Sequence, residues 1–152
     1  MKILDCTLRD GGYYNKWDFS KEVVNAYLEA MCQAKIDIVE LGLRNFPKNG
    51  FDGPFAYTTE SFIKSLNLPT GPTYGVMVDA KMILASTLTV TEAVDELFNH
   101  SSKSKIDLVR IAANYHEIEA SGAIVKALKH KGYIVGFNLM KSGGESSKTI
   151  TE

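Results

Sequence analysis

The chain has 152 residues, a length that suits one domain with a hydrophobic core of its own. Hydrophobic residues make up 45% of it, and 17 basic side chains nearly balance 18 acidic ones. Because the net charge is only -1, nothing in the composition points to a nucleic-acid partner or to a membrane surface. No apolar run reaches the roughly 18 residues of a membrane span, and we recognise no signal peptide. With only Cys6 and Cys32, a reducing, cytoplasmic location fits better than a disulfide framework.

The first segment of interest is DCTLRDGG at residues 5–12. An apolar-rich run at residues 2–5 predicts a strand, and Arg9, Asp10 and two glycines follow it directly. We expect a loop here that presents a cation and a carboxylate, because glycine permits unusual backbone angles and close approach of a ligand. A turn with a surface ion pair has the same pattern, since short motifs also match by chance.

Helical periodicity and capping residues predict four helices after this segment. They span residues 20–34, with Ser20 as N-cap, residues 59–66, residues 89–99 and residues 114–131. The last two helices begin with residues spaced as capping boxes, Thr89 with Glu92 and Asn114 with Glu117. Gly132 is placed to end the last helix.

Short apolar runs with β-branched residues predict further strands at residues 36–43, 73–78, 106–112 and 133–140. A long loop is expected at residues 44–58 and another from residue 141. Strand starts about 30 to 35 residues apart are typical of the βα repeat of a parallel sheet. A barrel of eight such units needs roughly 250 residues, so this chain holds about four and a half of them.

Polar side chains recur near the carboxyl ends of the predicted strands. Strand alternation places Asp5 and Thr7 on one face of the first strand, and Glu40, Arg110 and Asn138 on faces of later ones. Charges inside a parallel sheet must be paired or functional, because burying a lone charge is very costly. We expect the side chains Asp5, Glu40, Arg110, Arg9 and Asp10 to pair with one another in a cluster where α/β folds place active sites. A purely structural ion-pair network would have the same pattern.

The motif Asp5-x-Thr7-Leu8-Arg9-Asp10-Gly11 resembles the first-strand signature of the DRE-TIM metallolyases, the superfamily of 3-hydroxy-3-methylglutaryl-CoA lyase. The Glu40-Leu41-Gly42 end of the second strand and residues 109–140 look most like its 4-hydroxy-2-oxovalerate aldolase branch. The resemblance covers essentially the whole chain. It implies the N-terminal part of a (β/α)8 TIM barrel, with residues 1–152 forming its first five strands and stopping before strand six.

The resemblance also implies a divalent metal, Mn²⁺ or Mg²⁺ and in some relatives Zn²⁺, and chemistry next to a 2-oxo acid. Asp10 would ligate the metal and Arg9 would stabilise a pyruvate enolate. Asp5, Thr7, Glu40, Arg44, Arg110 and Asn138 would bind substrate or support these groups, with Glu40 orienting Arg9 or Arg44.

Two positions depart from the family pattern. Tyr13 stands where the related aldolases have a histidine thought to act as base, and an unperturbed phenol, with a pKa near 10, is a poor base at neutral pH. The His-x-His metal ligands of the sixth strand have no counterpart here. His100, His116 and His130 fall on helices or helix ends, where solvent-facing or capping roles are the usual ones.

Three functions therefore stay open at this point. The first is a metal-dependent aldolase acting on a 2-oxo acid, and the second is a Claisen-type synthase or carboxyltransferase like 2-isopropylmalate synthase. The third is a non-catalytic half-barrel that only self-associates. Two open sheet edges favour a homo-oligomer, or pairing with the C-terminal half of the barrel.

Overall fold

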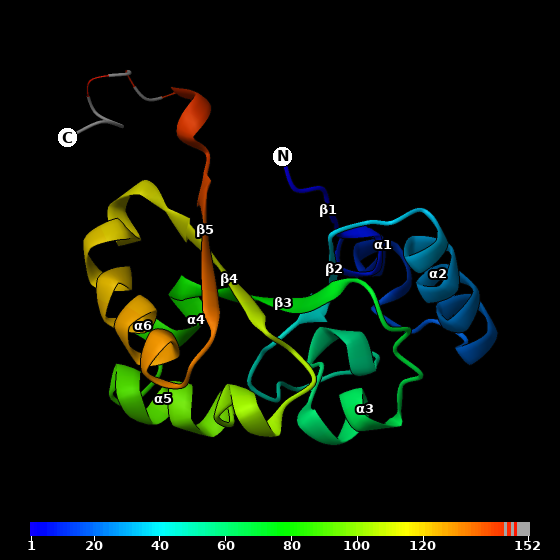
Figure 1. Cartoon of the computed structure of the whole chain (residues 1–152). Helices are drawn as coiled ribbons and strands as arrows, with labels where there is room; N and C mark the ends of the chain where they lie inside the picture. Colours follow the sequence, from blue (N-terminus) through cyan, green and yellow to red (C-terminus); the bar gives the residue numbers. More distant parts are fainter. Residues whose placement is uncertain (145, 147, 149–152) are drawn as a thin grey trace.

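Five parallel strands form one sheet in the computed structural model, which describes residues 1–144, 146 and 148. The strands lie in chain order, and each pairs in parallel with the next. They are β1 (Leu4–Asp5), β2 (Ile38–Leu43), β3 (Thr73–Asp79), β4 (Leu108–Asn114) and β5 (Ile134–Met140). The predicted parallel βα units in barrel order are therefore confirmed, and the sheet forms a half-barrel (Figure 1).

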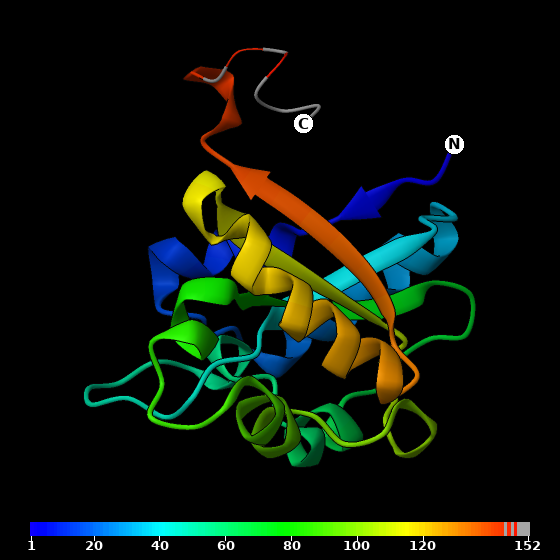
Figure 2. The same ribbon diagram turned by 90° about the vertical axis from the view of Figure 1, so that its left-hand side faces the viewer.

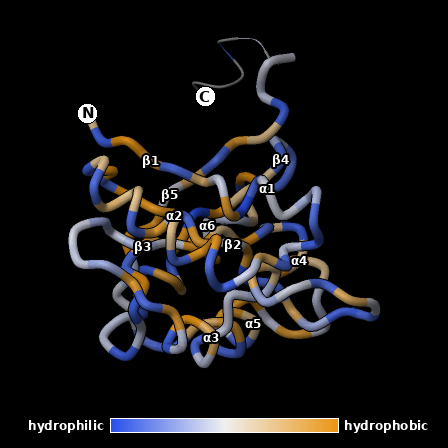
Figure 3. Tube along the Cα trace, turned by 90° about the vertical axis from the view of Figure 1, so that its right-hand side faces the viewer, coloured by the Kyte–Doolittle hydropathy of each residue, from blue (hydrophilic) through white to orange (hydrophobic). Residues whose placement is uncertain are grey.

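The helices follow the outer side of the curved sheet (Figure 2). They are α1 (Thr7–Asn15), α2 (Lys21–Gln33), α3 (Glu60–Ser65), α4 (Ala80–Leu84), α5 (Val90–Leu97) and α6 (Ile118–His130). The core lies between these helices and the sheet, and hydrophobic stretches of the chain gather there (Figure 3). No helix among the described residues is long and apolar enough to cross a membrane.

Local capping explains where the predicted helices begin and end. The Ser20 side chain accepts a hydrogen bond from the Val23 N–H at the start of α2. The predicted capping box of Thr89 precedes α5, and that of Asn114 precedes the 3-10 turn Tyr115–Glu117, which leads into α6. Gly132 has a φ of +85° just after α6, a backbone angle that favours glycine at the end of a helix.

Three features differ from the sequence-based expectations. The segment after β1 is the helix α1 rather than a loop, and the first helix of the β3–β4 connection, α4, was not predicted. The register of β2 against β3 shifts between Glu40 and Leu43, which breaks the expected alternation. Gly42 consequently faces the 3-10 turn Pro54–Ala56, where an added Cβ would lie 2.2 Å from the Phe55 carbonyl oxygen.

The predicted tail from residue 141 begins with the 3-10 turn Ser142–Gly144, and most of its remainder lies outside the described residues.

Candidate functional site

Arg9, Glu40 and Arg110 form an ion-pair cluster on the face of the sheet opposite the main helix layer. The Glu40 carboxylate has no solvent exposure. It accepts hydrogen bonds from Arg9 Nε at 2.9 Å and from Arg110 Nε and Nη2 at 2.7 Å each. Asp10 in turn pairs with Arg9, so two cations and two carboxylates neutralise one another. We expected Arg9, Asp10, Glu40, Arg110 and Asn138 to converge, and the contacts confirm this for the first four, whereas Asn138 makes no hydrogen bond to them in the described part of the chain.

The sheet register explains how Arg110 on β4 reaches Glu40 on β2 across the intervening strand. Glu40 pairs with Gly75 on β3, and Gly75 pairs with Leu108, two residues before Arg110. An added Cβ on Gly75 would lie 2.9 Å from the Leu108 carbonyl oxygen and 3.0 Å from Leu108 Cδ2, so Gly75 leaves room on this face for the Leu108 side chain. On the other side, Arg110 pairs with Gly136 of β5, where an added Cβ would lie 3.5 Å from Arg110 Cγ.

Glu40 holds both arginines in fixed orientations. Its two oxygens receive the Nε and Nη2 groups of Arg110 in a bidentate arrangement, which is geometrically specific and stronger than a single neutral hydrogen bond. Hydrogen bonding to Glu40 raises the pKa of Arg110 and outweighs the opposing effect of burial. The expectation that Glu40 contacts Arg9 is therefore met.

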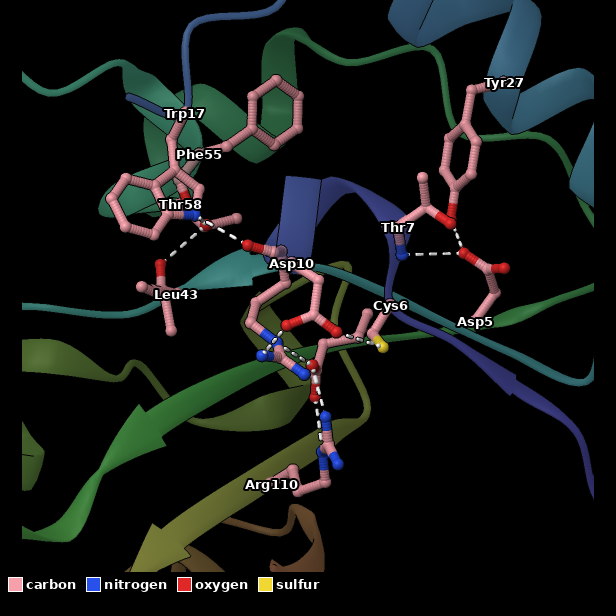
Figure 4. A network of polar contacts seen from close by, with 12 residues as sticks. Asp5, Cys6, Thr7, Asp10, Trp17, Tyr27, Leu43, Phe55, Thr58 and Arg110 are labelled. Carbon is pink, nitrogen blue, oxygen red and sulfur yellow. Dashed lines mark hydrogen bonds and ion pairs between the residues drawn. The ribbon is translucent and has the colours of Figure 1, made fainter. Parts of the chain in front are cut away.

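Asp5 does not join this cluster, contrary to the prediction, and Thr7 contacts Asp5 rather than the cluster. Asp5 pairs in register with Val39 rather than Glu40, so it lies on the opposite face of the sheet. There its carboxylate accepts hydrogen bonds from the Tyr27 hydroxyl of α2 and from the Thr7 N–H (Figure 4). Burial opposes ionisation of Asp5, but these hydrogen bonds prevail and lower its pKa, while burial and the Asp5 carboxylate raise the pKa of Tyr27.

Arg44 also lies apart from the cluster, so the suggestion that Glu40 orients it is wrong. Its guanidinium is buried behind the sheet, where it donates to the Leu97 carbonyl at 2.6 Å and to Glu60 at 3.0 Å. It also lies 5.1 Å from the ring centroid of Phe98. Arg44 and Glu60 line a cavity of about 610 Å³ that contains none of the clustered residues.

A second cavity, of about 430 Å³, lies at the carboxyl ends of the strands. Its lining includes Tyr13 from α1 and Met140 from the end of β5, so Tyr13, which follows the first strand closely in the sequence, lies at this mouth as we expected from that position. Ala112 also lines it and lies two residues beyond Arg110 on β4. Asn138 pairs in register with Ala112 and shares its face, one step beyond the ion-pair cluster.

Cys6 and Trp17 belong to this neighbourhood although the sequence did not single them out for it. The Cys6 thiol donates to Asp10 at 3.2 Å, and burial together with the Asp10 carboxylate raises the pKa of Cys6. Trp17 Nε1 donates to the Arg9 carbonyl at 2.9 Å, and its indole packs over Gly12. The sequence signal for this contact was the glycine pair after Arg9 and Asp10, which we interpreted as a loop. In the structure the pair lies in a helix, and the missing side chain of Gly12 leaves room for the Trp17 ring.

The described residues can supply part of a metal site. Asp10 offers a half-exposed carboxylate, a hard oxygen donor that suits Mg²⁺ or Mn²⁺ better than Zn²⁺. Among the residues described, no group of three histidine, cysteine, aspartate or glutamate side chains could hold an ion. His100, His116 and His130 are all exposed, as expected. Of the residues predicted to bind metal, Asp10 could therefore act as one ligand, and further ligands would have to come from outside the described residues.

Among solved structures that are similar to this chain, one matches it over its whole length. It is the crystal structure described as "the N-terminal domain of a putative aldolase from Bacteroides vulgatus", with 37% sequence identity and a TM-score of 0.85. The similarity covers 100% of this chain and 49% of that one, so this chain spans about half of its length. No protein-family model matches the chain, and no curated protein matches it in sequence.

Proposed function

We propose that this chain is the N-terminal half of a divalent-metal-dependent aldolase that cleaves a 4-hydroxy-2-oxo acid into pyruvate and an aldehyde. The observation that carries the proposal is the Arg9–Asp10 pair, which follows the carboxyl end of β1 and is held there by buried Glu40 of β2. The similarity to a structure described as part of an aldolase supports it. Because that structure is about twice as long, we propose that further strands complete a (β/α)8 barrel of the DRE-TIM type.

Arg9 would stabilise the charge that develops during cleavage. The 4-hydroxyl group loses its proton and the C3–C4 bond breaks, which releases the aldehyde. The electron pair of the broken C3–C4 bond passes into the pyruvate enolate. Arg9 Nε and Nη1 are bound by Glu40 and Asp10, and no contact among the described residues occupies Nη2. That N–H group is free to bind the enolate oxygen, and a donor already held in place needs no reorganisation at the moment of reaction. A proton then returns to C3 and yields pyruvate.

Asp10 would hold the metal, which when bound would polarise the 2-oxo acid as a Lewis acid. Tyr13 would move the proton of the 4-hydroxyl group, since its ring lines the mouth cavity. Its ring lies edge-on to Trp17, with 4.7 Å between centroids, and this contact limits its orientation. Glu40 and Arg110 act by positioning Arg9.

The direct test is pyruvate release from 4-hydroxy-2-oxovalerate in the presence of Mn²⁺ or Mg²⁺. In the complete barrel, which this chain alone does not form, we expect activity that Arg9→Lys lowers strongly, because a lysine cannot keep the Glu40 and Asp10 contacts while also binding the enolate. Tyr13→Phe should lower kcat by about 10²–10⁴-fold, the usual range for an acid–base group, and leave Mn²⁺ affinity unchanged. Tyr14→Phe, on the same helix but 95% exposed, is the matched control. If the Arg9→Lys protein turns over at the parent rate, the proposal is wrong.

A further inference from the structure

The cavity at the carboxyl ends of the strands has a markedly apolar lining. Three methionines from different elements contribute to it, Met77 of β3, Met82 of α4 and Met140 of β5, together with Trp17 and Phe46. Methionine side chains are flexible and polarisable, so such a wall adapts to apolar chains of different shape. A volume of about 430 Å³ lies in the range of small-molecule sites and exceeds the needs of a two-carbon aldehyde.

The charged and amide groups of this lining already have partners. Lys48 pairs with Asp52 at 2.8 Å, Asp79 accepts the Lys81 N–H at 2.9 Å, and Asn45 donates to the Ala56 carbonyl at 2.9 Å. A phosphate or carboxylate entering the cavity would therefore meet no unpaired cation among the described lining residues. Burying an anion without a partner is very costly, so the cavity disfavours anionic ligands.

The position of the cavity ties it to the ion-pair cluster. Met77 pairs in register with Arg110, and Ala112 lies two residues further along the same face of β4. The cavity thus lies directly beyond Arg110, toward the carboxyl ends of the strands. The Arg9 carbonyl accepts a hydrogen bond from Trp17, another wall of the cavity, so both sites share one framework.

We propose that this cavity is the subsite for the aldehyde half of the substrate and that it selects an uncharged apolar chain over a short or phosphorylated one. This inference rests on the proposed aldolase function. It identifies the substrate class as 4-hydroxy-2-oxo acids whose C4 substituent is an apolar chain of several carbons.

Trp17 gives a direct readout of binding, because it is the only tryptophan of the chain and lines the cavity. The probes are butan-1-ol and hexan-1-ol, which are unreactive analogues of the aldehydes, and glycerol 3-phosphate. Each methylene moved from water into an apolar site tightens binding about fourfold, so hexan-1-ol should bind about 16-fold more tightly than butan-1-ol. Glycerol 3-phosphate should leave the Trp17 emission unchanged.

The substitution Met140→Lys tests whether the alcohols bind in this cavity. An ammonium group at the end of β5 should weaken hexan-1-ol binding about tenfold, because an apolar chain would have to displace its hydration. Val23→Lys, which makes the same charge change at an exposed position of α2, is the matched control and should bind like the parent. Equal affinities for the two alcohols, tight glycerol 3-phosphate binding, or an unaffected Met140→Lys protein would each overturn the subsite.

Different experimental outcomes would contradict the proposed subsite and the proposed aldolase function. Pyruvate release from 4-hydroxy-2-oxovalerate without chain-length-dependent alcohol binding overturns the subsite and leaves the aldolase proposal standing. Conversely, chain-length-dependent binding with no cleavage of any 4-hydroxy-2-oxo acid in the presence of Mn²⁺ or Mg²⁺ overturns the assignment of the cavity to an aldehyde.

Discussion

At the scale of single residues, Glu40 matters most because it is a fully buried charge with two guanidinium partners. Burial of a carboxylate is tolerated only when its hydrogen bonds are satisfied, and here three N–H groups satisfy them. The arginines are less buried, with side-chain exposures of 12% for Arg9 and 19% for Arg110. If Glu40 is removed, water can therefore hydrogen-bond to the two guanidinium groups and replace part of the lost interaction.

Glu40→Gln should lower the free energy of unfolding by about 3 kcal/mol, the lower end of the range for breaking a buried pair, since both arginines keep some solvent contact. Urea unfolding followed by circular dichroism measures the change. Glu29→Gln on the exposed side of α2 is the control and should stay within about 0.5 kcal/mol of the parent. A Glu40→Gln protein of parental stability would mean that the cluster does not need this charge.

The Asp5–Tyr27 hydrogen bond predicts a pH dependence. The pKa of Asp5 in the folded protein lies below its ordinary value of 3.8. Its contribution to stability is therefore fully present above pH 3.8 and is lost as the pH falls through the folded-state pKa. Tyr27→Phe removes the donor and should make this acid-side loss of stability shallower.

Urea unfolding at pH 6, 4 and 3 tests the Tyr27→Phe prediction. The difference in unfolding free energy between parent and variant should be largest at pH 6 and shrink toward pH 3. Tyr14→Phe should show no such pH-dependent difference, because that side chain is exposed. A Tyr27→Phe difference that stays constant with pH would refute the role assigned to Asp5.

At the scale of elements, the segment after β1 is the helix α1 and not the expected loop. Gly12 serves close packing against Trp17 in this helix, and not the unusual backbone angle that we expected of a loop. An added Cβ on Gly12 would lie 1.9 Å from Cδ1 of Trp17, whereas one on Gly11 would lie 3.6 Å from Phe19 Cζ, an ordinary contact. Close packing therefore requires a glycine at position 12, whereas a Cβ would fit at position 11. The indole that occupies the space over Gly12 also binds the Arg9 carbonyl.

Substitution of the two glycines should have opposite effects on stability. Gly12→Ala should destabilise by about 1–3 kcal/mol, because the new methyl group displaces Trp17. Gly11→Ala should be neutral or stabilise by up to about 1 kcal/mol, since alanine is the better helix former. Thermal unfolding and Trp17 emission measure both, and a shift of emission is expected for Gly12→Ala alone. Equal destabilisation by the two substitutions would contradict this account of α1.

At the scale of the whole molecule, the described sheet has open edges at β1 and β5. Ile134 and Phe137 of β5 are 58% and 43% exposed. Edge strands with exposed apolar side chains invite pairing with another chain, and lysine on an edge strand discourages it. We therefore expect the 152-residue chain to self-associate through this edge.

Light scattering across a concentration series tests this expectation. The parent should show a mass that rises with concentration, whereas Phe137→Lys should remain closer to a monomer. Val23→Lys, which adds the same charge on α2, should associate like the parent. A parent chain that stays monomeric at all concentrations would rule out the expected edge pairing.

The sequence by itself determined the order of the strands, the parallel sheet, the helices α2, α3, α5 and α6, and their N-terminal caps. These features depend on local periodicity and on hydrogen bonds over three or four residues, as for Ser20 and Thr89. It also indicated that Arg9, Asp10, Glu40 and Arg110 belong together, because charges inside a parallel sheet need partners.

Only the tertiary structure decided which polar side chains meet. Asp5 lies on the wrong face for the cluster because β1 pairs with β2 in a register that alternation alone does not specify. Arg44 binds Glu60 because the register shift in β2 turns it toward the helices. Arg110 reaches a glutamate 70 positions away in the chain, a contact that depends on how two strands align across Gly75. Local sequence carries no record of such alignments, since they arise only when distant segments pack against one another.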